Sequence, residues 1–367
     1  MIFMNTENVK VSVIIPIYNA ADYIRPAIDS VLAQTLSEFE IICVDDGSTD
    51  STLEVLREYQ KIDSRVRIVT ETNAGPAYAR NNGMRRARGE YVAFLDADDF
   101  FEPEMLRRLY ELASDGDLDI AIANFDVYNN KKGKFENPNA AENADIFDGG
   151  RISSKNEYPD RILTSTVGAA WNKLFRRSFV EEKGLSFLAD VHIYEDVYFV
   201  TTALSLAERV GRASEILVHH RIHSDQSRKK AVKKYYAEVP PVYLKIKDFL
   251  TSHGMYAPLS RSYLNLSAGR CYKMFNLLSG DAQSRLWDML HEEYAELFSW
   301  QDAEELDFEL KEVYEFTVFV QVFTHAEFKK RTKHGRKPRI VNPKQNIEFV
   351  KQRRRFRTLL GGIFKKK

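Results

Sequence analysis

The sequence predicts an α/β protein with a mainly parallel, doubly wound sheet, followed by a helical C-terminal region. Two observations predict this class. From Val11 to Asp99, short β-branched runs alternate with segments whose apolar residues recur at helical spacing. From Tyr235 onward, long stretches contain little Gly or Pro and read as helices. Strand, helix, strand, helix in succession is the pattern of right-handed crossovers in a parallel sheet.

The predicted elements follow one another closely in the first third of the chain. Strands are expected at 11–15, 40–44, 66–69, 91–95 and 118–125, with helices at 24–32, from 53 and at 77–87. A polar insertion from 129 to 143 is expected to be a loop or hairpin. Helical stretches are expected at 263–278, 282–298 and 306–330. We therefore expect three parts: an α/β domain over residues 9–230, a helical domain over 231–345 and a basic amphipathic tail over 346–367.

Charge and cysteine content exclude several classes of protein. The 367 residues contain 53 Lys and Arg and 53 Asp and Glu, so no net charge attracts nucleic acid, and we expect no nucleic-acid partner. Cys43 and Cys271 are the only cysteines, which argues against a disulfide framework or a zinc site and fits a reducing, cytoplasmic location. No signal peptide or transmembrane segment is recognisable in the sequence.

Three carboxylates occur within four positions at the end of one predicted strand, in Asp96-Ala97-Asp98-Asp99. Hard divalent cations such as Mn²⁺ and Mg²⁺ bind carboxylate oxygens together with substrate phosphates, so this cluster suits a metal-diphosphate site. The alternative is an acidic, solvated turn that caps the next helix.

A second acidic turn, Asp45-Asp46-Gly47-Ser48-Thr49-Asp50, follows another predicted strand. A carboxylate placed there can accept a hydrogen bond from a nucleobase N–H or a ribose hydroxyl. The alternative is that these residues only form the turn and cap the following helix. In an open parallel sheet, ligands lie beyond the carboxyl ends of the strands, which is where both acidic turns are predicted.

The motifs together resemble the family 2 glycosyltransferases. They are, in order, Val11-Ser-Val-Ile-Ile-Pro-Ile-Tyr-Asn19, Val44-Asp-Asp-Gly-Ser-Thr-Asp50, Asn73-Ala-Gly75, Ala79-Arg-Asn-Asn-Gly83, Gly89-Glu-Tyr91 and Phe94-Leu-Asp-Ala-Asp-Asp99. The resemblance runs from Val11 to about Asp126 and implies the GT-A fold. It also implies that the donor nucleotide is bound by Pro16, Tyr18, Asn19, Asp46, Arg80 and Asp96. Asp98 would hold Mn²⁺ or Mg²⁺ against the donor diphosphate, with Asp99 behind it.

Two later segments resemble motifs of bacterial members of the same family. These segments are Trp171-Asn-Lys-Leu-Phe-Arg-Arg177 and Tyr194-Glu-Asp-Val-Tyr-Phe199. The second implies that Asp196 is the base that takes the acceptor proton, and the alternative is an acid that only stabilises a helix N-terminus. Trp171 and Lys173 could shape the acceptor pocket, although Trp171 could equally be a core aromatic.

The segment His219-His220-Arg221-Ile222-His223 resembles the Tyr-Arg-x-His motif of many relatives, with His220 where Tyr is usual. His223 is therefore expected to complete the metal shell, and Arg221 or Arg228 to neutralise the leaving group. The alternative is a loop of solvated His and Arg side chains.

The last segment, 351–367, mixes eight cations with five large apolar residues and contains no acid. This composition suits contact with an anionic membrane surface, and the alternatives are a solvated tail or a nucleic-acid patch. Taken with the resemblance, it implies a protein peripherally associated with the inner face of the cell membrane.

The resemblance implies an inverting, metal-dependent hexosyltransferase or N-acetylhexosaminyltransferase. Its donor would be a nucleotide-sugar, in most cases a UDP-sugar, and its acceptor a saccharide or lipid-linked saccharide in the synthesis of capsule, lipopolysaccharide or exopolysaccharide. The two alternative functions are a nucleotidyltransferase and a non-catalytic nucleotide-sugar-binding scaffold. Pro16-Ile-Tyr-Asn19 lacks the Gly-rich, basic phosphate loop that a nucleotidyltransferase would need.

Overall fold

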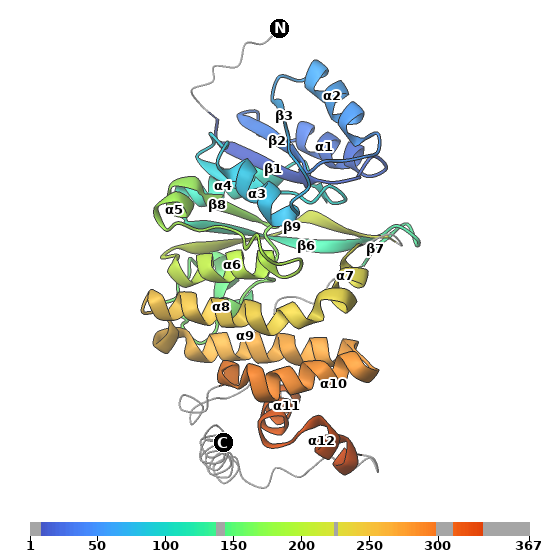
Figure 1. The fold of residues 1–367 in the computed structure, drawn as a ribbon. Coiled ribbons are helices and arrows are strands. Elements are labelled where there is room, and N and C mark those ends of the chain that lie inside the picture. Colours follow the sequence, from blue (N-terminus) through green and yellow to red (C-terminus); the bar gives the residue numbers. More distant parts are fainter. Residues whose placement is uncertain (1–8, 137–143, 224–226, 299–310, 333–367) are drawn as a thin grey trace. The chain divides into compact units, whose positions relative to one another are not determined.

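The computed structural model describes residues 9–136, 144–223, 227–298 and 311–332. The chain divides into two compact units, residues 1–232 and 233–367. The first unit is built on a mixed sheet and the second is helical (Figure 1). The sheet contains β1 (Val11–Ile17), β2 (Phe39–Asp45), β3 (Val66–Thr70), β4 (Tyr91–Phe94), β5 (Phe100–Phe101), β6 (Ile120–Asn129), β7 (Lys134–Glu136), β8 (Lys173–Arg176) and β9 (Val210–Ile222).

The strands β1 to β4 pair in parallel, as the sequence predicts, and their order in the sheet is β3, β2, β1, β4. All seven side chains of β1 are buried, because helices cover both faces of this part of the sheet. Ile14 pairs with Ile42 on one side and Phe94 on the other. The carboxyl ends of β1, β2 and β4 therefore reach one edge of the sheet, where the two acidic turns begin.

The second half of the sheet adds antiparallel strands to the mainly parallel sheet that the sequence predicts. β8 runs antiparallel to both β4 and β6, whereas β6 and β9 are parallel. β8 is a four-residue strand that begins with a buried Lys, so it lacks the apolar run or alternation by which a strand is recognised in a sequence. β7 pairs with β6 as a short hairpin within the polar insertion, where residues 137–143 lie outside the described residues.

Helices of the first unit pack on the two faces of the sheet. They are α1 (Ile24–Leu32), α2 (Thr52–Ile62), α3 (Pro76–Met84), α4 (Met105–Asp115), α5 (Arg177–Glu182) and α6 (Glu195–Leu206). A further helix, α7 (Ser227–Tyr235), begins in the first unit and ends in the second. Val13 and Ile15 of β1 join Ile28 of α1 in one apolar core. Ile14 faces the other way, towards α3, where a Cβ added to Gly83 would lie 2.4 Å from its Cγ2. This close packing requires Gly in the motif that carries Arg80.

The second unit is built around buried aromatic side chains. Its described helices are α8 (Val239–Ser252), α9 (Tyr256–Leu277), α10 (Gly280–Asp288), α11 (Lys311–Val322) and α12 (His325–Thr332). Trp287 is fully buried, stacks on Phe328 at 4.5 Å and donates its indole N–H to the Phe323 carbonyl. The single helix expected over 282–298 is instead divided, because α10 continues as a π-helical turn and then a 3₁₀ turn.

The basic tail, residues 346–367, lies outside the described residues, and so does the end of the helical region that was expected to precede it. Within the described part of the chain, no helix combines the length and the apolar character needed to cross a bilayer.

Candidate active site at the strand ends

Backbone N–H groups bind both oxygens of the Asp46 carboxylate. Its Oδ1 accepts from Ala74 at 2.7 Å and its Oδ2 from Gly75 at 2.8 Å. The side chain is buried, and Gly75 has a φ of 95°, which favours glycine. Asp46 therefore fixes the turn that leads into α3, a structural role that the sequence analysis did not identify.

Asn19 connects the loops that follow β1 and β2. It lies in the left-handed region with a φ of 48°, accepts at Oδ1 from the Thr49 N–H and donates its own N–H to Ser48 Oγ. Pro16 pairs with Val44 inside the sheet, whereas Tyr18 is 51% exposed. Pro16 is thus part of the framework, and Tyr18 presents a ring to solvent beside the Asp46 turn.

Asp99 of the acidic loop, which follows β4, is bound by two residues of β9. This carboxylate is fully buried, accepts the Arg221 N–H at 2.8 Å and lies 3.1 Å from His220 Nδ1. Burial raises the pKa of Asp99 to about 6, although His220 opposes the shift. Arg221 also donates its Nε to the Asp98 carbonyl at 2.8 Å. These contacts determine the direction in which Asp98 points.

Asp98 and His223 face each other, with Asp98 Oδ2 3.0 Å from His223 Nε2. The His223 ring stacks on Tyr23 with centroids 4.3 Å apart. Its Nδ1 is buried and has no hydrogen-bond partner within the described ranges. One carboxylate oxygen and one imidazole nitrogen therefore converge beside the acidic loop.

Asp98 and His223 together suit a divalent cation whose other ligands come from substrate and water. Among residues 9–136, 144–223, 227–298 and 311–332, no three His, Cys, Asp or Glu side chains gather to hold a metal. Mn²⁺ and Mg²⁺ commonly combine one or two protein ligands with substrate phosphates and water. An oxygen and nitrogen pair suits Mn²⁺ better than Mg²⁺, which prefers oxygen.

Arg80 joins the acidic loop to the first turn of α6. Its Nη2 donates to Asp96 Oδ1 at 2.7 Å and its Nη1 to Glu195 Oε1 at 3.0 Å. Burial opposes the charged form of Arg80, but the carboxylates of Asp96, Glu195 and Asp196 outweigh it and raise the pKa of Arg80. The same burial, together with Asp196, raises the pKa of Glu195 to about 7 despite Arg80. The pairing connects Asp96 of the acidic loop to Glu195, the residue directly before Asp196.

Asp196 is the second residue of α6, and its Oδ1 accepts a hydrogen bond from the backbone N–H of Val197 at 2.7 Å. Lys173 of β8 is fully buried near it. The Lys173 ammonium donates to the carbonyls of Val167 and Ala169 and to Asn172 Oδ1 at 2.8–2.9 Å. Burial lowers the pKa of Lys173 to about 7, and the Asp196 charge opposes that shift. Lys173 therefore holds the preceding loop from inside and has no exposed surface for an acceptor.

Trp171 is a core aromatic, which was one of the two alternatives left by the sequence. It is 6% exposed, packs edge-on against Phe125 and stacks on His220. The segment 219–222 lies in β9 and not in a solvated loop. His219 is buried between Asp126 and Glu102, at 2.5 Å and 2.7 Å from its two ring nitrogens.

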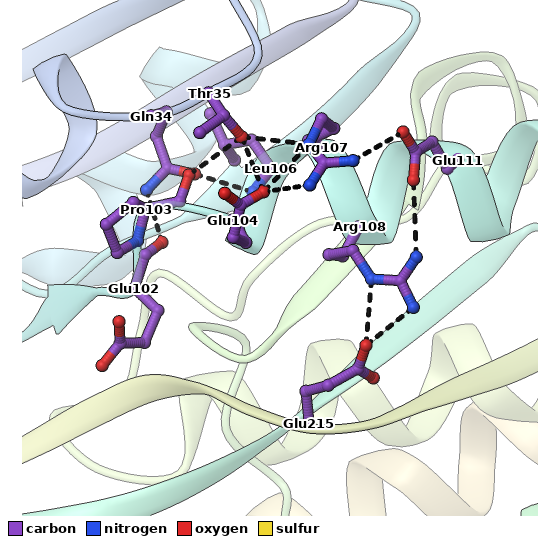
Figure 2. A network of polar contacts seen from close by, with 10 residues as sticks. All are labelled: Gln34, Thr35, Glu102, Pro103, Glu104, Leu106, Arg107, Arg108, Glu111 and Glu215. Atoms are coloured by element: carbon purple, nitrogen blue, oxygen red, sulfur yellow. Dashed lines mark hydrogen bonds and ion pairs between the residues drawn. The ribbon is translucent and has the colours of Figure 1, made fainter.

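A polar network anchors the segment that follows the acidic loop (Figure 2). Gln34, just beyond α1, donates to the Glu102 carbonyl at 2.7 Å and accepts the Leu106 N–H at 2.8 Å. Arg108 of α4 pairs with Glu215 of β9. The segment that follows the acidic loop is consequently held by Gln34, and α4 is held by β9 through Arg108.

Comparison with known proteins agrees with this architecture. The family model described as Glycosyl transferase family 2 matches residues 12–184. EpsH of Bacillus subtilis (strain 168), a protein named as a glycosyltransferase, is 34% identical over 220 residues, which cover 59% of this chain and 62% of EpsH. The poly(ribitol-phosphate) beta-glucosyltransferase of Bacillus spizizenii (strain ATCC 23059 / NRRL B-14472 / W23) is 30% identical over 223 residues, covering 59% of this chain and 33% of that protein.

Among solved structures, S. aureus TarS 1–349 in complex with UDP superposes with a TM-score of 0.67 at 20% identity. The match covers 90% of this chain and 93% of that one. It supports the fold, including additional helices in the C-terminal region. By contrast, this chain spans only about three fifths of EpsH, since the aligned part is 62% of that relative.

Proposed function

We propose, from the premise that this chain belongs to glycosyl transferase family 2, that it transfers a sugar from a UDP-sugar to an acceptor hydroxyl with inversion. The observation that carries this proposal is the Arg80 pairing, which brings Asp96 of the acidic loop and Glu195 beside Asp196 to one site. A donor diphosphate at the strand ends and a base at the start of α6 are the two components that such a reaction needs.

The proposed donor side comprises Pro16, Tyr18, Asn19, Asp46, Arg80 and Asp96. Asp46 fixes the turn before α3, Tyr18 offers an exposed ring, and Arg80 acts on this side through Asp96. The choice of UDP is supported by the UDP complex of TarS, a protein of the same fold. Asp98 and His223 are proposed to hold Mn²⁺ or Mg²⁺, which when bound offsets the negative charge of the diphosphate.

Asp196 is the proposed catalytic base. The acceptor oxygen attacks the anomeric carbon while the bond from that carbon to the diphosphate oxygen breaks, and the electron pair of that bond leaves with UDP. The acceptor hydroxyl proton passes to the Asp196 carboxylate. A single displacement inverts the anomeric configuration and needs no covalent intermediate on the protein.

The acceptor is proposed to be a saccharide or lipid-linked saccharide of a bacterial surface polysaccharide. The relative named poly(ribitol-phosphate) beta-glucosyltransferase supports a glycosylated polymer as the class of product. We further propose that the basic tail, residues 346–367, binds the anionic inner face of the cell membrane, where lipid-linked acceptors would be found.

The experiment that tests the proposal measures UDP release by the purified chain with UDP-, GDP- and dTDP-sugars, in Mn²⁺ or in chelator. Release from one UDP-sugar that stops in chelator is the expected result. Release without metal would reject the role of Asp98 and His223. Nucleotide binding without release, for every donor and acceptor, would favour a scaffold.

A further inference from the structure

We infer that Arg80 and Glu195 form a positioning bridge that fixes the first turn of α6, and with it Asp196, relative to the acidic loop. The inference rests on the proposed function, because it gives the bridge its task of aligning the proposed base with the donor. Neither residue needs to touch a substrate in this role. The bridge acts through Asp96 on one side and through the helix start on the other.

In the bridge, one guanidinium binds two carboxylates. Arg80 uses a different terminal nitrogen for each carboxylate, at 2.7 Å to Asp96 and 3.0 Å to Glu195. The Arg80 and Glu195 side chains are 8% and 11% exposed, whereas Asp96 is 29% exposed. The pairing of Arg80 with Glu195 is thus shielded from water. A charge-assisted hydrogen bond in such a place is screened less by salt than one at the surface.

Packing against Phe187 fixes the orientation of the Arg80 guanidinium plane. The guanidinium lies over the Phe187 ring, 5.4 Å from its centroid. Asn81, the next residue along α3, donates to the Phe187 carbonyl at 2.8 Å and accepts the Phe187 N–H at 2.9 Å. Because Phe187 is fixed to α3 in this way, the fork has a defined orientation. A Lys at position 80 would keep the charge but could not direct two donors along fixed directions.

The start of α6 depends on such an anchor. Tyr194, directly before the helix, has a φ of 67°, a left-handed conformation that large side chains adopt only under constraint from the surrounding structure. On the other side, Gly168 packs so closely on Val197 that an added Cβ would lie 2.9 Å from Val197 Cγ2. Asp196 lies between Glu195 and Val197, so a shift of the helix start moves the proposed base directly.

Two substitutions remove the bridge from opposite ends. Glu195→Gln keeps the shape of the side chain and an oxygen acceptor but removes the charge, and Arg80→Lys removes the fork. The full chain is assayed for UDP release with its active UDP-sugar, and binding is measured with UDP and Mn²⁺. We expect each variant to lower kcat about 10- to 100-fold, the cost of misplacing a catalytic group by roughly 1 Å. In Glu195→Gln, which leaves the pairing of Arg80 with Asp96 in place, the Kd for UDP should stay within about threefold of the wild type.

The double variant separates a shared bridge from two independent roles. If both residues act as one unit, the kcat of the double variant lies within about threefold of the kcat of the less active single variant. Effects that multiply would overturn the inference. A raised Kd for UDP with unchanged kcat would overturn it too, since Arg80 would then be a direct donor ligand.

Glu40→Gln is the matched control. Glu40 is also buried and also pairs with an Arg, Arg88, at 2.8 Å, but lies at the amino end of β2. The Glu40→Gln substitution should lower the melting temperature and leave kcat unchanged. Wild-type UDP release is measured first, so a failure of the proposed function is seen before the variants are compared. If Arg80→Lys does not fold, Glu195→Gln decides alone, because an unchanged kcat in that variant contradicts the bridge.

Discussion

The imidazole of His220 stacks on the indole of Trp171, with ring centroids 5.4 Å apart and planes 4° from parallel. The Nδ1 atom of the same imidazole lies 3.1 Å from both oxygens of the buried Asp99 carboxylate. His220 thus connects a core aromatic to the acidic loop. The side chain combines an apolar contact on its face with a polar contact on its edge.

Replacing His220 by Phe should separate these two contacts. Phe keeps the stack on Trp171 but leaves Asp99 without its side-chain partner, so we expect a loss of about 1–3 kcal/mol in the free energy of unfolding. Urea denaturation measures it. His253→Phe is the control, since His253 is exposed and stacks on Phe249 at 4.0 Å. Equal losses in both variants would show that the Asp99 contact contributes nothing specific.

Asp196→Asn should abolish transfer while leaving UDP binding nearly intact. The amide keeps the shape of the side chain but cannot accept the acceptor proton, and general-base catalysis is typically worth about 10²- to 10⁴-fold in rate. Transfer rates and UDP titration calorimetry measure the two effects. Asp117→Asn, at a carboxylate that is 79% exposed and paired with Arg176, is the control. Undiminished transfer by Asp196→Asn would reject the assignment of the base.

Lys173→Met should reduce both stability and turnover. It removes all three donors to the loop before β8 and leaves the Val167 and Ala169 carbonyls unsatisfied, at a cost of about 3 kcal/mol or more. Lys155→Met is the matched control, because Lys155 is also buried and donates to the Leu206 and Ala207 carbonyls. The control should lose stability but keep its kcat per folded molecule. A normal kcat in Lys173→Met would show that the loop does not affect the site.

Stability should depend on pH through Glu195. Burial raises its pKa from 4.5 to about 7, so this group's contribution is fully present below pH 4.5 and is lost as the pH rises through 7. Glutamine does not titrate. The unfolding free energy of the wild type, relative to Glu195→Gln, should therefore fall between pH 4.5 and 7, by up to about 3 kcal/mol. Urea midpoints at several pH values measure it, and a difference that rises with pH contradicts the prediction.

Removing residues 351–367 should release the chain from anionic vesicles. Each cation near such a surface contributes about 1 kcal/mol, and the segment has eight cations. Co-sedimentation with vesicles rich in anionic lipid measures binding, and neutral vesicles serve as the control. If the shortened chain sediments as well as the full one, the tail is not the membrane anchor.

The parallel half of the fold was predictable because its signals are local. The apolar runs of β1 and β2 and the acids that follow them are contiguous in sequence, and buried parallel strands need such runs. By contrast, β8 was missed, because its four residues start with Lys173 and carry no period. The burial of His219 and the pairing of His220 with a buried carboxylate were also missed, since His and Arg residues there resemble a loop until Asp126, Glu102 and Asp99 are found beside them.

The sequence by itself determined the α/β class, the parallel character of the first strands and the presence of two acidic turns at strand ends. These properties depend on periodicity and on turn chemistry within short windows. Only the tertiary structure decided that Arg80 pairs with Glu195, 115 positions away, and that Lys173 is buried beneath the loop before β8. Such contacts are set by how the sheet and helices pack, and residue spacing along the chain does not encode the direction in which a side chain finally points.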